Sequence, residues 1–334
     1  MKPRLAITIG DVNGIGPEII VKAFEDPELL ALCRPVIVGS VRALEKYAQY
    51  GALSDRIARA SEPDLHSLAE DAVGILEPPD LAAPAITLGS ISADAGRFAF
   101  HCVEVATRLA LSGRVDAIVT CPVSKTAVNM AGYRYAGHTE FLAELCGCAD
   151  YRMMLVAGEL RVVHLTTHVS LREALNQVTS PRVADTIRLA HQAVEQLGIK
   201  QPKIAVAGLN PHAGEGTLFG TEERDEIAPA IETVRADGID VTGPVPPDTV
   251  FMQMAHGKFD AVVAMYHDQG HIPLKMAAFN RTVNVTLGLP VIRTSVGHGT
   301  AFDIAGRGRA DPTSLAEAVR LAATMARKRQ QVSQ

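Results

Sequence analysis

The chain has 334 residues and a formal net charge of −5, which argues against a broad nucleic-acid-binding face, because such a face is basic. Aromatic residues make up only 4% of the chain and tryptophan is absent, so platforms for stacking bases are not expected either. A chain of this length has room for about two domains, each with its own hydrophobic core.

The five cysteines show no repeated pair spacing, which is typical of a protein in a reducing compartment. The apolar stretch near the N-terminus, 5–9, is too short for a signal peptide. No run of about eighteen apolar residues is present to span a membrane. We therefore expect a cytoplasmic protein without a membrane partner.

Short runs rich in Val, Ile and Ala alternate with longer amphipathic stretches along the chain. The runs suit strands buried on both faces of a largely parallel sheet, at 5–9, 35–38, 116–120, 162–166, 203–209 and 260–265. The amphipathic stretches are expected to be helices, at 98–112, 180–198 and 313–327. This alternation predicts an α/β architecture. No single cut separates two domains, so one domain is expected to be inserted into the other.

A glycine-rich turn, Gly10-Asp11-Val12-Asn13-Gly14-Ile15-Gly16, follows the first predicted strand. Glycines at a strand-to-helix turn let backbone N–H groups approach an anion. The spacing matches neither the dinucleotide fingerprint Gly-x-Gly-x-x-Gly nor a P-loop. A ligand-binding turn and a purely structural turn both fit this motif.

A second candidate site follows the predicted strand at 116–120. Lys125 lies just beyond that strand, where open α/β sheets bind ligands. His138 and Thr139 precede a helix expected to begin near Glu140, and such a helix start suits a phosphate or a carboxylate.

Three histidines, His168, His212 and His267, each lie just beyond a predicted strand. Neutral imidazoles at rigid strand ends are good ligands for Zn²⁺ and similar divalent metals. Three protein ligands would leave positions for substrate oxygens, which is the pattern of a catalytic metal site.

His267 and His271 are four residues apart, a spacing that zinc proteases use on a helix. Gly270 and Pro273 argue against a helix there, and no Glu follows His267. We therefore expect no protease-type zinc motif and no helix over 267–273.

Lys275, Asn284 and Arg293 fall close together in a segment with little other charge. A planar Arg fork, a Lys point charge and an Asn amide together suit a small phosphorylated or carboxylated molecule. The glycine-rich stretch 297–308 comes next, and it predicts a loop whose backbone can lie close to a ligand.

Together these residues resemble the 4-hydroxythreonine-4-phosphate dehydrogenase family of vitamin B6 (pyridoxine) biosynthesis. The specific matches are Gly-His-Thr-Glu at 137–140, Leu-Asn-Pro-His-Ala-Gly-Glu at 209–215, Tyr-His-Asp-Gln-Gly at 266–270 and Leu-Gly-Leu-Pro-Val-Ile-Arg-Thr-Ser at 287–295. The loop at 298–308 is also similar to the adenosine-side loop of isopropylmalate and isocitrate dehydrogenases.

The resemblance implies a two-domain isocitrate/isopropylmalate dehydrogenase-like fold, with mostly parallel sheets and an active-site cleft between the domains. Residues 1–128 plus 286–334 would form the nucleotide-side domain, and 129–285 the domain for metal, substrate and dimerisation. It also implies NAD or NADP, one divalent ion per site (Zn, Mg, Mn or Co), and a homodimer that shares each metal site across its interface.

Carried over position by position, the resemblance implies a role for each candidate residue. Metal ligands would be His168, His212 and His267; substrate contacts would be His138, Thr139, Lys275, Asn284 and Arg293; acid–base groups would be Lys275, Asp268 and Asp248; and cofactor contacts would be Gly297, His298, Gly299 and Asp303.

The implied reaction oxidises and decarboxylates 4-phosphohydroxy-L-threonine to 3-amino-2-oxopropyl phosphate. Residues 271–273 and 297–299 are closer to a related branch, which acts on D-threonate or D-erythronate 4-phosphate and gives dihydroxyacetone phosphate. A dihydrodiol dehydrogenase, a phosphate acyltransferase of related fold and a non-catalytic ligand sensor are the remaining alternatives.

Overall fold

The computed structural model describes residues 2–51, 53, 56–69, 71–135 and 137–332. It divides into two compact units, one formed by Met1–Ala149 with Leu289–Gln334 and the other by Asp150–Gly288. The chain first passes from one unit to the other after Ala149, beyond the boundary predicted at 128. The reason is that α5 (Lys125–Met130) and α6 (His138–Leu145) pack on α4 (Ala93–Leu111), which belongs to the first unit.

The first unit is built on six parallel strands in the order β3-β4-β2-β1-β5-β12. Apart from the edge strand β3, their apolar side chains are buried on both faces, as expected for a parallel sheet between helical layers. The strands are β1 (Arg4–Thr8), β2 (Arg34–Val38), β3 (Ile57–Arg59), β4 (Val73–Leu76), β5 (Ala117–Thr120) and β12 (Ile292–Val296).

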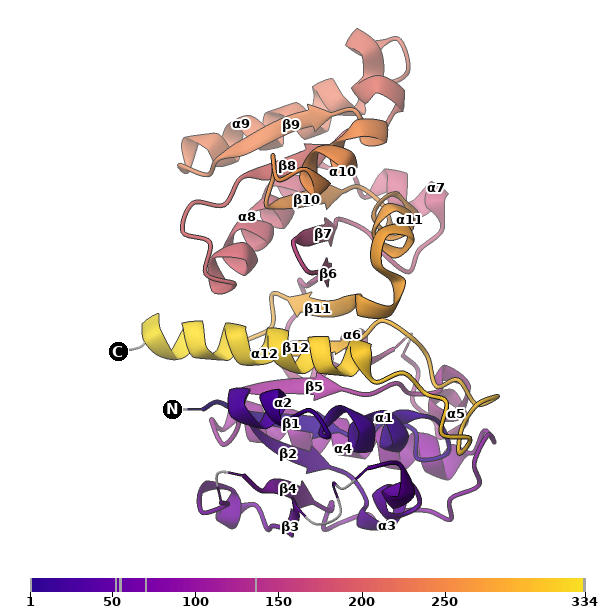
Figure 1. Cartoon of the computed structure of the whole chain (residues 1–334). Helices are drawn as coiled ribbons and strands as arrows, with labels where there is room; N and C mark the ends of the chain where they lie inside the picture. Colours follow the sequence, from indigo (N-terminus) through magenta and orange to yellow (C-terminus); the bar gives the residue numbers. More distant parts are fainter. Residues whose placement is uncertain (1, 52, 54–55, 70, 136, 333–334) are drawn as a thin grey trace. The chain divides into compact units, whose positions relative to one another are not determined.

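Helices cover both faces of this sheet. In Figure 1, α1 and α12 lie in front of the strands and α4 lies behind them. Besides α4, α5 and α6, the helices are α1 (Gly16–Ala23), α2 (Pro27–Leu32), α3 (Val41–Glu45), α12 (Thr313–Val332) and the 3-10 turns η1 (Ala48–Tyr50) and η3 (Pro63–His66).

The second unit has a mixed sheet in the order β11-β6-β7-β10-β8-β9. The strand β6 runs antiparallel to both of its neighbours, β11 and β7, whereas β7, β10, β8 and β9 run parallel. The strands are β6 (Arg152–Ala157), β7 (Leu160–His164), β8 (Ile204–Ala207), β9 (Val241–Val245), β10 (Ala261–Ala264) and β11 (Val283–Leu287).

Helices also pack on the sheet of the second unit. Val250 and Met254 of α10 and Leu274 of α11 join one apolar cluster with residues of β6, β7, β8 and β10. The helical segments are α7 (Leu171–Asn176), α8 (Ser180–Gln196), η4 (Pro211–Thr217), η5 (Glu223–Ile227), α9 (Ala228–Ala236), α10 (Pro247–Ala255), α11 (His267–Ala278) and η6 (Phe279–Arg281).

The α/β prediction is confirmed, and every predicted strand is present to within two residues at each end. Of the strands that the sequence did not predict, β3 and β4 are short and β9, β11 and β12 carry mixed side chains, whereas β6 is an apolar run after Arg152 that was missed. Within the described residues, no helix is long and apolar enough to cross a membrane.

The prediction of no helix over 267–273 was wrong. The helix α11 runs from His267 to Ala278 with Pro273 inside it. Tertiary contacts outweigh the local cost of Gly270 and Pro273: Gln269 is buried and bonds both the backbone N–H of Met265 (2.6 Å) and the carbonyl of Gly208 (2.7 Å).

A buried carboxyl group follows β1. Asp11 is 0% exposed, and its Oδ1 accepts a hydrogen bond of 3.0 Å from the N–H of Asn13. Its Oδ2 is buried without a hydrogen-bond partner among the described residues. Burial raises the pKa of Asp11 from its ordinary value of 3.8 to about 6, although the bond from Asn13 opposes the rise.

The substitution Asp11→Asn should therefore change stability in a pH-dependent way. The folded chain binds the Asp11 proton more tightly than the unfolded chain, so this carboxyl stabilises the fold below pH 4 and loses that contribution as pH rises through about 6. At about 1.4 kcal/mol per pKa unit, the unfolding free energy of the wild type should fall relative to Asp11→Asn by up to about 3 kcal/mol. Urea unfolding of both proteins at pH 4 and pH 7 measures this difference, and an equal gap at both pH values would contradict the assignment.

Candidate active site

A pocket of about 310 Å³ lies in the second unit, beyond the carboxyl ends of two neighbouring strands. Since β7 and β10 are parallel and His164 pairs with Ala264, the segments after both strands leave the sheet at the same edge. The lining comprises Thr166, Thr167, His168, Val169, Leu171, Ala174, Tyr266, His267 and Asp268. Two of the predicted metal ligands, His168 and His267, thus line one pocket, with ring centroids 6.1 Å apart.

The tautomer of His267 is set by Asp268. The Nδ1 of His267 is 2.6 Å from Oδ1 of Asp268, and a carboxylate can only accept, so Nδ1 carries the hydrogen. The same contact holds the pKa of Asp268 below its usual value. In neutral His267 the lone pair is consequently on Nε2, the arrangement typical of a histidine that binds a metal while a carboxylate orients it.

Two further histidines lie against His267. The ring of His271, one turn along α11, stacks on it with centroids 3.6 Å apart at 15°. The Nδ1 of His271 is 3.1 Å from Nε2 of His164, whose own Nδ1 is 3.3 Å from the carbonyl of Met153. Because that carbonyl only accepts, His164 carries hydrogen on Nδ1 and accepts from His271.

Both histidines are neutral at physiological pH. Burial is the main cause that lowers the pKa of His164 to about 3 and that of His271 to about 4. The pair therefore supports His267 without adding positive charge beside it. The sequence did not indicate this role, because His164 is separated from His271 by more than a hundred residues.

The third predicted ligand, His212, lies on η4 after β8. Since β8 is the parallel neighbour of β10, this segment leaves the sheet at the same edge as His267. Within the part of the chain that the structure describes, no three His, Cys, Asp or Glu side chains are gathered into a group that could hold a metal. The full triad remains a prediction, and the pair on the pocket with a free Nε2 on His267 has the donor chemistry that a divalent ion needs.

The other predicted groups of this unit lie on nearby elements. Lys275 follows His271 by one further turn of α11, with its Nζ 5.9 Å from the ring centroid of Phe279. Asp248 is exposed in the first turn of α10. Asn284 lies on β11, and its Oδ1 is buried without a hydrogen-bond partner among the described residues.

The first unit contains a buried cation at the carboxyl edge of its sheet. Arg293 of β12 is 2% exposed and donates to Oγ1 of Thr120 (2.7 Å) and Oγ1 of Thr139 (3.4 Å). Burial lowers the pKa of Arg293 to about 10, which still leaves it protonated at neutral pH. Thr139 itself lies in the first turn of α6, so the guanidinium and a helix start face one region.

His138 opens the same helix and is neutral. Burial, and then the charge of Arg293, lower the pKa of His138 well below its usual value. Its Nε2 is buried and has no hydrogen-bond partner among the described residues. A permanent cation beside an unsatisfied imidazole nitrogen and a helix start is an arrangement that suits an anionic group such as phosphate.

The predicted cofactor loop, 297–308, follows β12 and is held by the glycine-rich turn after β1. The N–H of Ile15 donates to the carbonyl of Thr300 (3.1 Å), and a Cβ on Gly14 would lie 2.9 Å from that carbonyl oxygen. This close approach explains the glycine. The first motif therefore has a supporting role that its spacing did not reveal.

Two charged residues of α1 also bind this loop. The Nζ of Lys22 donates to the carbonyls of Gly308 (2.8 Å) and Ala310 (2.9 Å), and buried Glu18 accepts from the N–H of Ala310 (2.8 Å). In the loop itself, His298 bonds the carbonyl of Gly299 and Asp303 is exposed. Whether Gly297, His298, Gly299 and Asp303 contact a nucleotide stays a prediction.

Comparison with known proteins decides the family. The profile described as "Pyridoxal phosphate biosynthetic protein PdxA" matches residues 31–322. The chain belongs to the PdxA family. It is 45% identical to D-threonate 4-phosphate dehydrogenase of Cupriavidus necator, over 98% of both chains.

Solved structures of similar proteins agree with this assignment. A crystal structure of 4-hydroxythreonine-4-phosphate dehydrogenase from Klebsiella pneumoniae has a TM-score of 0.84 and 45% identity, covering 97% of this chain and 99% of that one. A terephthalate 1,2-cis-dihydrodiol dehydrogenase from Burkholderia xenovorans has a TM-score of 0.68 and 35% identity, over 96% and 98%. These relatives are dehydrogenases, and the present PdxA-family chain is an oxidoreductase rather than an acyltransferase.

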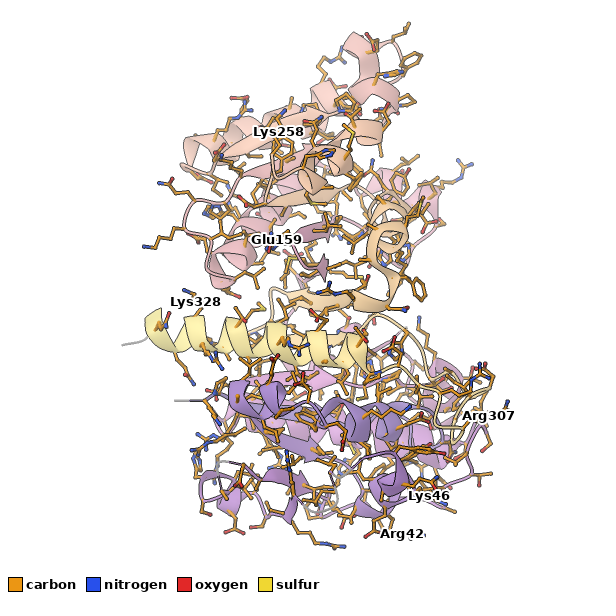
Figure 2. All side chains as sticks on the ribbon, viewed as in Figure 1. Arg42, Lys46, Glu159, Lys258, Arg307 and Lys328 are labelled. Atoms are coloured by element: carbon orange, nitrogen blue, oxygen red, sulfur yellow. The ribbon has the colours of Figure 1, made fainter. Side chains whose placement is uncertain are left out.

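If Arg293 forms an anion site, inorganic phosphate should stabilise the wild type, because a ligand that binds only the folded state raises the melting temperature. The substitution Arg293→Met should abolish that rise. Arg42→Met serves as a matched control, since Arg42 is exposed on α3 of the same unit (Figure 2). Thermal unfolding with and without phosphate gives the comparison, and an equal rise in all three proteins would rule out a role for Arg293.

Proposed function

We propose that this PdxA-family enzyme oxidises and then decarboxylates a four-carbon, 4-phosphorylated hydroxy acid, with D-threonate 4-phosphate as the leading candidate. The observation that carries the proposal is the buried Arg293 beside neutral His138, which favours a phosphorylated substrate. The similarity to D-threonate 4-phosphate dehydrogenases of Cupriavidus necator and Salmonella typhimurium, at 45% and 46% identity, supports the choice of sugar acid.

The second candidate substrate is 4-phosphohydroxy-L-threonine, which would give 3-amino-2-oxopropyl phosphate. The similarity to 4-hydroxythreonine-4-phosphate dehydrogenase of Klebsiella pneumoniae favours it at the same level of identity. Both substrates carry a phosphate and a secondary hydroxyl next to a carbon that bears the carboxylate. A dihydrodiol substrate has no phosphate, so it would offer no matching anionic group to the buried cation at Arg293.

In this proposal Arg293, His138 and Thr139 bind the phosphate, with Lys275 and Asn284 as further polar contacts. His168, His212 and His267 hold a divalent ion, which when bound would act as a Lewis acid toward the substrate hydroxyl and toward the negative charge left by CO₂. NAD or NADP, next to residues 297–303, would take the hydride.

For the proton of the hydroxyl, we propose Lys275 as the acceptor. Asp268 is already engaged with His267, and this contact lowers its pKa and makes it a weak base. Asp268 then serves to orient His267, while the exposed Asp248 is a candidate for the later proton transfer. Loss of CO₂ from the β-keto acid would leave an enolate that needs one proton to form dihydroxyacetone phosphate.

A homodimer in the cytoplasm completes the proposal. Two observations support a partner subunit: the described residues of one chain gather no three-ligand group, and large apolar side chains of α10, α11 and η6 are exposed, namely Met252, Ile272, Met276 and Phe279. The five cysteines are unpaired, which fits a reducing compartment.

The substrate assignment predicts faster reduction of the nicotinamide with D-threonate 4-phosphate than with 4-phosphohydroxy-L-threonine. The assay follows absorbance of the reduced nucleotide with Zn²⁺, Mg²⁺, Mn²⁺ or Co²⁺ present, and D-erythronate 4-phosphate is tested in parallel. A preference for the amino acid would select the second candidate. No reduction with any of the three would refute the proposed chemistry.

The orienting role of Asp268 predicts that Asp268→Ala weakens Zn²⁺ binding by roughly 10- to 100-fold, the usual effect of removing a group that orients a metal-binding histidine. Asp268→Asn should cost less, because the amide oxygen can still accept from Nδ1 of His267. Competition with a chromogenic chelator measures both affinities. Unchanged affinity in Asp268→Ala would show that His267 needs no such partner.

A further inference from the structure

The segment that carries His212 has an unusual backbone. His212, Ala213 and Glu215 have φ values of 53°, 54° and 41°, with Gly214 and Gly216 at 82° and 62° in the same turn. Side chains of L-residues disfavour this left-handed region, and a run of such residues is rare. Contacts outside the turn must therefore hold it in place.

The carboxylate of Glu223 anchors the chain immediately before this turn. Its Oε1 accepts hydrogen bonds of 2.7 Å from the N–H groups of Leu209 and Asn210, and its Oε2 accepts one of 2.9 Å from Nδ2 of Asn210. Glu223 is 5% exposed, so these bonds form away from bulk water. Charge-assisted bonds of this kind are stronger than bonds between neutral groups.

Packing around the carboxylate is as tight as its hydrogen bonding. A Cβ on Gly214 would lie 2.9 Å from Oε2 of Glu223, and a Cβ on Gly208 would lie 2.8 Å from Cα of Ala213. The turn thus closes directly over Glu223, and Gly208 before the turn and Gly214 within it allow that approach. The path of the chain through His212 depends on where this carboxylate lies.

An amide could not replace the carboxylate. All three of the bonds described above bring a hydrogen toward Glu223, from two backbone N–H groups and one side-chain amide. A Gln at this position would keep one acceptor atom, but its NH₂ group would meet another donor. The substitution Glu223→Gln keeps the shape of the side chain and removes one of the two hydrogen-bond acceptor atoms.

From this geometry we propose that Glu223 is a positioning residue that directs the imidazole of His212 through the left-handed turn. The inference rests on the proposed function, in which His212 is a metal ligand. Glu223 itself would touch neither metal nor substrate. Its effect would appear in how strongly, and with what geometry, the metal is held.

The test is titration of the full-length apoprotein with Co²⁺, with affinity and the visible d–d absorption bands as two readouts that do not depend on turnover. Glu223→Gln should bind Co²⁺ roughly 10- to 100-fold more weakly than the wild type, with altered bands, because the bands report coordination geometry. The matched control is Glu159→Gln, since Glu159 lies in the same unit with its side chain 90% exposed (Figure 2).

A third variant, His212→Ala, separates the two hypotheses. If His212→Ala binds Co²⁺ as the wild type does, His212 is not a ligand and the proposed function fails at that point. If His212→Ala loses affinity while folded Glu223→Gln keeps both wild-type affinity and wild-type bands, the positioning role is overturned and the metal role stands.

Should Glu223→Gln fail to fold, Asn210→Ser provides the measurement. It removes the amide that bonds Glu223 and Glu222 but leaves the two backbone bonds in place. We expect a smaller loss of Co²⁺ affinity with a shift of the bands in the same direction. A folded Asn210→Ser with unchanged affinity and bands would overturn the proposal.

Discussion

The parallel register of β7, β10 and β8 is the constraint on which the candidate site depends. The pairing of Val162 with Val262, and of Val263 with Val206, brings the carboxyl ends of all three strands to one edge. His168, His212 and His267 are then delivered by the segments that follow. A slip of one residue in β7 would turn His164 to the opposite face of the sheet and break its bond to His271. The positions of these histidines therefore depend on the pairing of the three strands.

The first unit meets a different physical demand, which is to keep a cation in its interior. Arg293 is nearly fully buried, and burying a charge is costly unless it is paired or hydrogen-bonded. Bonds to the hydroxyls of Thr120 and Thr139 meet part of that cost. His138 adds no second charge, because its pKa is held low by burial and by Arg293 itself. A dianionic ligand beside Arg293 would lower the free-energy cost of this buried charge rather than raise it.

Some of this was predictable from sequence, and the limits have physical causes. Runs of β-branched residues locate strands, and in an α/β sheet polar residues just beyond a strand are site candidates; this identified His168 and His212. Arg293 was instead identified by its proximity in sequence to Lys275 and Asn284, and the structure places it inside β12. The helix at 267–278 was missed because Gly270 and Pro273 oppose it locally and its support comes from distant partners. The hydrogen bonds of Glu223 that support the His212 turn were not predicted, because nothing in the sequence pattern links Glu223 to Asn210. The hydride chemistry came from the family resemblance alone.

The anchoring of loop 297–308, and of Ala310 just after it, has a consequence for which substitutions this enzyme can accept. Ile15, Glu18 and Lys22 bind main-chain atoms of Thr300, Gly308 and Ala310, so they hold the loop whatever side chains it presents. Side-chain identity and loop placement are therefore separable. Replacements at exposed loop positions such as Asp303 leave every one of these anchors intact. A loop held by its backbone can exchange the side chains it offers to a ligand while the fold stays as it is. Under the proposed placement of NAD or NADP next to residues 297–303, these exposed positions are where nucleotide preference would diverge or could be redesigned.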